Sequence, residues 1–161
     1  MRIRFYIYAA MFALLFAGLH CFRLWQPEWQ IVLHTEHLLK AAGKRDWTGV
    51  ARFLDERYAD RWGHGKASAI GDAHDAFQQF FSLSIAPESP SGAADRARGV
   101  VTARLKFNGN GTAVAQAVRN YLNGLHAPFT FEWRRKSWKP WDWQLVRMDN
   151  AELEIDKNLA L

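Results

Sequence analysis

An apolar run near the N-terminus most constrains what this chain can fold into. No charged residue occurs from Phe5 to Phe22, and arginines flank the run on both sides. As a helix, these 18 residues would span about 27 Å, at about 1.5 Å per residue, which nearly matches a hydrocarbon core about 30 Å thick. The run therefore predicts a single membrane-spanning helix.

A cleaved secretory signal peptide has the same general pattern, so the residues that end the run decide between the two interpretations. Cleavage needs small residues at positions −3 and −1, and the available pairs join a small residue to a large one, such as Ala17 with Leu19. We therefore expect an uncleaved signal-anchor over residues 1–26. A cleaved signal and a buried core helix remain the alternatives.

The arginines on the two sides of the run predict its orientation. Arg2, Arg4 and the α-amino group precede the run, whereas only Arg23 follows it closely. Positive charge favours the cytoplasmic side, so we expect the rest of the chain on the extracytoplasmic side, which is the periplasmic side in a bacterium.

Charge and cysteine content exclude several classes of function. The net charge is +5, but Arg2, Arg4 and Arg23 contribute three of these charges, so the remaining chain is only mildly basic and we expect no nucleic-acid partner. Cys21 is the single cysteine, which excludes an intramolecular disulfide and a cysteine-based zinc site. His34 and His37 share a helix face without further ligands at a recognisable spacing, so we expect no metal site and no cofactor.

Helical periodicity marks three segments after Pro27. Residues 28–44 place apolar side chains on one broad face, and Gly43 and Lys44 end that helix. Asp46 is a good N-cap for a second helix, whose apolar stripe runs from Trp47 to Tyr58. The segments that follow are a turn with at most a short strand over residues 59–66 and a third helix over residues 67–81.

The second half of the chain changes to a strand period. Composition predicts a loop over residues 87–95 and a hairpin turn over residues 108–111, which are Asn-Gly-Asn-Gly. Residues 112–125 fit a short helix, with a bent strand as the alternative. Alternation of apolar and polar residues predicts strands over residues 101–107, 129–133 and 141–145. Three helices followed by a strand-rich half indicate an α+β fold on one core.

The order of these elements resembles that of the nuclear transport factor 2-like superfamily. The resemblance depends on helix, KRDW, helix, RYADRW, helix, and then strands ending in FTFEWRR and WDWQLVRMDN. It implies three helices packed on a curved antiparallel sheet, a cone fold, over residues 27–150, followed by a C-terminal tail over residues 151–161. Two features depart from the family: the strands expected before the third helix are compressed into residues 59–66, and residues 112–125 look like a helical insertion at the mouth of the cone.

The resemblance implies two classes of function. The superfamily contains isomerases, dehydratases and cyclases of the SnoaL/ketosteroid isomerase-like kind, which place a carboxylate or a histidine in the cone near an aromatic hydroxyl, and it contains many non-enzymatic members. The catalytic candidates here are Tyr58, Asp60 and His74, since a carboxylate in an apolar cavity can act as a base near neutral pH. No acid–base or nucleophile string accompanies them. We therefore expect a non-catalytic binding or assembly module, with a small-molecule enzyme as the alternative.

A basic, aromatic segment separates the last two predicted strands. Its residues could contact anionic lipid headgroups or a protein partner, and strand-end charges that keep an edge soluble are the alternative. The other expected partners are the membrane through residues 5–22, a homodimer or protein partner on the sheet face, and a small apolar ligand in the cone. The predicted contact residues are Arg134, Arg135, Lys136, Trp138, Lys139 and Trp141.

Overall fold

A computed structural model of the chain describes residues 6, 8, 11–19 and 25–154. Residues 11–19 are helical. Among the described residues, no helix is both long enough and apolar enough to cross a membrane. Part of the predicted anchor over residues 5–22 and part of the predicted tail lie outside the described residues, so both stay predictions.

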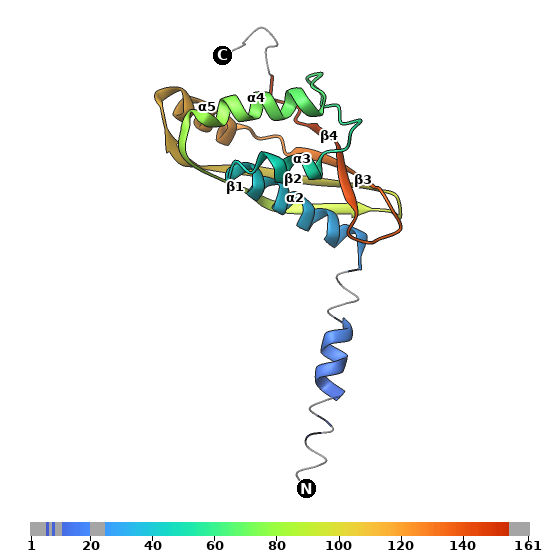
Figure 1. Cartoon of the computed structure of the whole chain (residues 1–161). Coiled ribbons are helices and arrows are strands. Elements are labelled where there is room, and N and C mark those ends of the chain that lie inside the picture. Colours follow the sequence, from blue (N-terminus) through green and yellow to red (C-terminus); the bar gives the residue numbers. More distant parts are fainter. Residues whose placement is uncertain (1–5, 7, 9–10, 20–24, 155–161) are drawn as a thin grey trace.

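A four-stranded antiparallel sheet with helices packed against it makes up the fold (Figure 1). The strands lie in the order β1-β2-β3-β4, so each strand pairs with its neighbour in the sequence. The predicted α+β class is confirmed. The elements are α2 (Pro27–Gly43), α3 (Trp47–Phe53), α4 (Lys66–Gln78), β1 (Phe80–Ala94), β2 (Arg98–Gly111), α5 (Ala113–Gly124), β3 (Phe129–Arg135) and β4 (Trp143–Asp149).

Local sequence signals account for where the helices begin. Pro27 lies in the first turn of α2, where a missing N–H costs no helical hydrogen bond. Asp46 caps α3 by accepting a 2.9 Å hydrogen bond from Gly49 N, and Thr112 caps α5 by accepting one of 3.2 Å from Ala115 N. The three helices predicted after Pro27 are confirmed, and residues 112–125 are resolved in favour of a helix.

The second helix is shorter than the apolar stripe suggested. It ends at Phe53, because the backbone becomes extended at Leu54 and forms a bridge to Leu145 on β4. Asp55 N then donates to Leu145 O over 2.9 Å. Leu54 and Tyr58 are therefore buried from a segment that is not helical and contains a turn at residues 56–57.

The loop predicted over residues 87–95 and the turn predicted over residues 108–111 are both wrong. Residues 87–94 belong to β1 and residues 108–111 to β2, and both segments are paired within the sheet, as Pro87 with Leu105 and Ser84 with Asn108 show. β1 is an edge strand with a bulge between Glu88 and Ser91, and an edge tolerates the prolines that suggested a loop. The actual turn follows Asp95, whose carboxylate accepts from Ala97 N at 2.6 Å and from Arg98 N at 2.7 Å.

Helix α5 covers the part of β2 that β3 does not reach. The pairing of β3 with β2 stops at Ala103. Beyond it, the Asn123 side chain accepts from Phe107 N at 2.8 Å and donates to Phe107 O at 2.9 Å, while Arg119 donates to Gly109 O at 2.7 Å. These side chains satisfy backbone groups that an open edge would present to another chain.

The core lies between the helices and the inner face of the sheet. Ile31 on α2 and Phe131 on β3 have no exposed surface, and Trp133 is 1% exposed. The periodicity of the sequence predicts that five aromatic residues share one core: Trp47, Phe77, Phe107, Phe131 and Trp143. Phe107, Phe131 and Trp143 are buried in it, whereas Trp47 and Phe77 are partly buried and pack against it.

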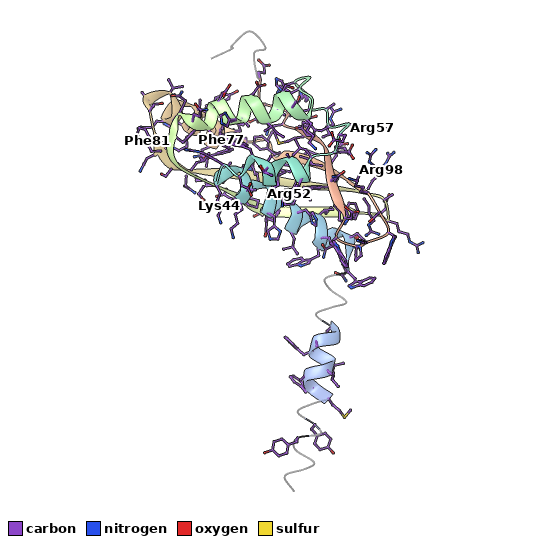
Figure 2. All side chains as sticks on the ribbon, viewed as in Figure 1. Lys44, Arg52, Arg57, Phe77, Phe81 and Arg98 are labelled. Atoms are coloured by element: carbon purple, nitrogen blue, oxygen red, sulfur yellow. The ribbon has the colours of Figure 1, made fainter. Side chains whose placement is uncertain are left out.

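Helix α4 is attached more loosely than the other helices. None of its residues is fully buried. The ring of Phe77, near the C-terminal end of α4 (Figure 2), lies 5.7 Å from the Trp47 ring and 6.2 Å from the Phe80 ring. These aromatic contacts join α4 to α3 and to the start of β1.

Candidate functional site

Tyr58, Asp60 and His64 form a cluster where the chain leaves α3. Tyr58 is 5% exposed, and burial, followed by the negative charge of Asp60, raises the pKa of its hydroxyl above the usual value. The nearly buried Asp60 carboxylate lies 2.9 Å from His64 Nδ1. His64 Nε2 lies 3.5 Å from the exposed Asp72 carboxylate on α4. The predicted candidates Tyr58 and Asp60 are thus brought together, and His64 joins them.

The hydrogen bonds of Asp60 serve its own loop. Its second oxygen accepts from His64 N at 2.8 Å, and Asp60 N donates to His64 O at 3.1 Å. Gly63 completes the turn with φ of 88°, a conformation that favours glycine. The loop then lies along β4, where Ala59 N donates to Val146 O at 3.1 Å. Asp60 therefore holds the compact loop that replaces the short strands of the family pattern.

His74, the third catalytic candidate, lies apart from this cluster. Its Nδ1 is 3.0 Å from Asp75 and 3.2 Å from the Gln78 amide, and its ring stands against Trp47 at 5.7 Å. The His74 side chain is 45% exposed. Its contacts on the described part of the chain therefore fit a surface residue of α4.

Asp55 and Arg134 form an ion pair that the sequence did not indicate. Arg134 Nη2 lies 2.6 Å from Asp55 Oδ2, and Arg57 N donates to the other oxygen at 2.9 Å. Burial alone would raise the pKa of Asp55, but the hydrogen bonds from Arg57 and Arg134, with the charges of both residues, lower it below the usual value. Since 79 residues separate the partners, no local pattern could have revealed this pair.

Polar groups in the interior are bonded to one another. Thr35 is fully buried, and its hydroxyl donates to Ile31 O at 2.9 Å. Asn150, 1% exposed, donates to Ala127 O and accepts from the backbone N–H groups of residues 152 and 153. In the described part of the chain, Arg135 Nε is the one buried side-chain nitrogen or oxygen without a hydrogen-bond partner.

Two residues of the predicted basic segment contact other side chains of the domain, and the other four are exposed. Arg134 is paired with Asp55, and the Arg135 guanidinium lies 4.8 Å from the centre of the Trp143 ring. Lys136 and Lys139 are exposed, as are Trp138 at 81% and Trp141 at 56%. These are the positions of the six predicted contact residues, and their contacts with lipid or protein stay predictions.

His34 joins this loop to helix α2. Its Nδ1 lies 2.8 Å from Gln30 O, and its Nε2 lies 2.9 Å from Trp141 O. Both partners are carbonyl oxygens, so a neutral ring, with its single N–H, donates to one of them at a time. The described residues contain no group of three or more His, Cys, Asp or Glu side chains placed to hold a metal ion.

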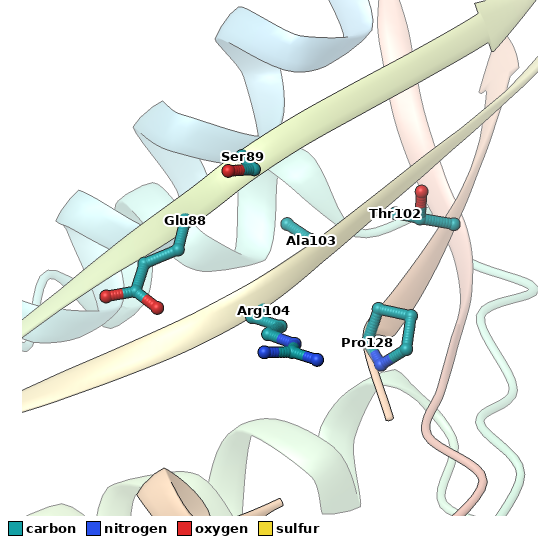
Figure 3. Close-up of a pocket in the computed structure, with 6 residues that line it drawn as sticks. All are labelled: Glu88, Ser89, Thr102, Ala103, Arg104 and Pro128. Atoms are coloured by element: carbon teal, nitrogen blue, oxygen red, sulfur yellow. The ribbon is translucent and has the colours of Figure 1, made fainter. Parts of the chain in front are cut away.

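The outer face of the sheet is polar. Arg147 lies 3.8 Å from Glu132 on β3 and 3.4 Å from Asp149. A pocket of about 410 Å³ opens beside β1 and β2 (Figure 3). Its walls place Arg104 across from the Glu88 carboxylate, so a ligand here would meet charged groups rather than an apolar cone. The lining residues are Glu88, Ser89, Thr102, Ala103, Arg104 and Pro128.

Comparison with known proteins identifies the fold. No protein-family model matches the sequence, and no curated protein sequence matches it. Solved structures do match. Bd1075 from Bdellovibrio bacteriovorus aligns with a TM-score of 0.58 at 12% identity over 75% of this chain, which spans only 40% of Bd1075. A nuclear transport factor 2-like protein from Cytophaga hutchinsonii aligns with a TM-score of 0.53 at 13% identity, over 74% of this chain and 93% of that protein.

A third match carries an enzyme name. A Novosphingobium aromaticivorans protein with the provisional name scytalone dehydratase aligns with a TM-score of 0.58 at 9% identity, over 74% of this chain and 79% of its own length. At such identities the likeness is one of fold. The chain has the nuclear transport factor 2-like fold, and the resemblance predicted from the sequence is confirmed at that level.

Proposed function

We propose that the chain is a membrane-anchored, non-catalytic binding or assembly module whose cone-shaped domain lies on the extracytoplasmic side. One observation carries the non-catalytic part: the interior carboxylate groups are bonded within the chain. Asp55 is held by Arg134 and Arg57, and Asp60 by His64. A general base must reach a proton of the substrate, whereas the Asp55 and Asp60 carboxylates already bind groups of their own chain.

The burial of large side chains supports the same proposal. Four of them are each at most 5% exposed, and close packing of such residues leaves less room for a substrate in the cone; they are Tyr58, Phe131, Trp133 and Trp143. The membrane part of the proposal depends on the apolar run over residues 5–22 and its flanking arginines.

A small-molecule enzyme is the second candidate, favoured by the juxtaposition of Tyr58, Asp60 and His64. An aromatic hydroxyl kept protonated beside a carboxylate–histidine pair is an acid–base arrangement. We expect small cyclic ketones to leave the thermal midpoint of the chain unchanged. A rise in the midpoint that disappears in Tyr58→Phe would instead favour the enzyme.

The anchor is tested on the full chain in a secreting host. We expect the chain to resist alkaline extraction of the membranes, to retain its first residues in mass spectrometry, and to be digested by protease added from outside the cell. A mature protein that begins between residues 17 and 26 would show that the apolar run is a cleaved signal.

A further inference from the structure

We infer that one end of the domain docks on anionic lipid headgroups through two loops that lie beside the first turn of α2. This inference rests on the proposed membrane anchoring and specifies which residues meet the bilayer. The loops are the turn between β1 and β2 and the segment between β3 and β4. Their contact residues, here called the basic end, are Arg96, Arg98, Lys136, Trp138, Lys139 and Trp141.

Hydrogen bonds hold the two loops together and against α2. Arg135 N donates to Ala97 O over 2.8 Å, which joins the β3–β4 segment to the β1–β2 turn. His34 Nε2, 2.9 Å from Trp141 O, joins the same segment to α2. Both loops lie at the end of the domain where α2 begins (Figure 1). They therefore present one surface beside the first turn of α2 (Figure 1).

The exposed side chains at this end suit a lipid headgroup layer. Trp138 is 81% exposed and Trp141 56%, and Trp25, just before α2, is 61% exposed. Indole rings are amphipathic and favour the boundary between bilayer and water. Lys136 and Lys139, on the same loop as two of these rings, are exposed cations that anionic headgroups attract.

The structure changes the set of cations that the sequence suggested. Arg134 and Arg135 are engaged by Asp55 and Trp143. Arg96 in the other loop and Arg98 at the start of β2 are exposed. Carboxylates also occur here. Glu28 and Asp142 lie at this end, and Asp95 is turned toward the backbone N–H groups of its own turn. The excess of positive charge is therefore small, and docking depends on a tether.

The tether is short. Residues 23–26 separate the apolar run from the first helical turn, and four extended residues span at most about 14 Å. If the run crosses the bilayer, the start of α2 cannot leave the headgroup layer by more than this distance. Contacts that would be too weak between separate molecules then become effective, because the local concentration of lipid is high.

The test uses hydrogen exchange on the full chain in lipid nanodiscs made of phosphatidylcholine alone or mixed with phosphatidylglycerol. We expect residues 136–142 to exchange more slowly in the anionic discs at low salt. A cation near such a surface contributes about fivefold in affinity, so Lys136→Gln/Lys139→Gln should reduce this extra protection about 25-fold. The matched control is Lys40→Gln/Lys44→Gln, at the opposite end of α2, which should leave the protection unchanged.

The outcomes separate the inference from the proposed function. A chain that stays in the discs but exchanges equally in both lipids, or responds equally to both double substitutions, would overturn the docking inference and leave the anchor intact. Protection that needs a second protein in the disc would also overturn it. A chain that alkaline extraction releases would overturn the proposed anchoring, and the inference with it.

Discussion

Trp133 on β3 donates a 3.1 Å hydrogen bond from Nε1 to the hydroxyl of Thr35 on α2, across 98 residues of sequence. Both side chains are buried, with Thr35 at 0% and Trp133 at 1% exposure. The Thr35 hydroxyl accepts this bond while it donates to Ile31 O. This contact fixes the position of α2 along the sheet, since sliding the helix would leave the indole N–H unpaired in the core.

Thr35→Val tests this contact. The valine keeps the volume but leaves the Trp133 N–H without an acceptor, so we expect the free energy of unfolding to fall by about 1–3 kcal/mol. Thr35→Ser is the control, because it keeps the hydroxyl and removes one methyl group, at a cost of about 0.8 kcal/mol. Urea unfolding followed by tryptophan fluorescence measures both. Equal losses in the two variants would contradict a stabilising role for the hydroxyl.

The stability of the domain should fall in acid. The pKa of Asp55 in the folded chain lies below its ordinary value, so its contribution is present above that ordinary value, about 3.9, and is lost as the pH falls through the folded pKa. Asp95 and Glu152, with pKa values lowered mainly by backbone hydrogen bonds, act with the same sign.

We expect Asp55→Asn to be less stable than the parent chain at neutral pH and to approach it as the pH falls below about 4. Thermal melts across an acid pH series measure the difference. The variant Asp75→Asn, whose carboxylate is exposed, is the control and should stay close to the parent in stability at neutral pH. A constant gap between Asp55→Asn and the parent would show that the ion pair does not titrate with folding.

The side-chain amide of Asn123 should contribute more to the free energy of unfolding than an ordinary surface residue of a helix does. Asn123→Ala removes both hydrogen bonds to the backbone of Phe107, and we expect a loss of about 1–3 kcal/mol. Asn120→Ala, on the exposed side of α5, should cost no more than about 0.5 kcal/mol. Chemical denaturation compares the two, and similar losses would mean that α5 does not seal the edge of β2 in this way.

Two glycines should respond to alanine in opposite directions. Gly109 has φ of +156°, and an added Cβ would stand 2.1 Å from Ser82 O, so Gly109→Ala should destabilise the β1–β2 pairing severely. Gly71 lies on α4, and apart from its own turn of helix no atom lies within 4 Å of an added Cβ, so Gly71→Ala should stabilise the chain by about 0.5–1 kcal/mol. Thermal midpoints measure both changes. A stable Gly109→Ala variant would contradict the backbone conformation of β2.

Side-chain periodicity predicted α2, α4 and the strands that form the inner face of the sheet, because burial of one face imposes that period on the sequence. The segment from Pro87 was misjudged for a physical reason: its composition resembles a loop, yet an edge strand needs hydrogen bonds on one side only. The Asn-Gly repeat that ends at Gly111 also suggested a turn. In the structure these residues form the end of β2, and the helix that covers this part of β2, α5, comes after them.

The candidate site was only partly accessible from the sequence. Tyr58 and Asp60 were found because the family resemblance directs attention to a carboxylate near an aromatic hydroxyl, and His64 lies in the same segment, four residues from Asp60. The pairing of Asp55 with Arg134 arises from the tertiary fold, so neither residue carries a local signal. Because Arg134 is paired with Asp55, it contributes less to the positive surface charge that the basic segment around it suggests.

The strand order has a consequence for how the chain folds. A sheet in which every strand pairs with the next one in sequence keeps its paired residues closer in sequence than a sheet with crossover connections, and shorter separations favour faster pairing. Helix α2 cannot use this advantage, because the Trp133 that pairs with Thr35 is synthesised 98 residues later. At about 5–20 residues per second, Trp133 follows α2 on the order of ten seconds later. Helix α2 can pack on β1 before then, but the hydrogen bond that fixes its position along the sheet forms only when β3 has been made.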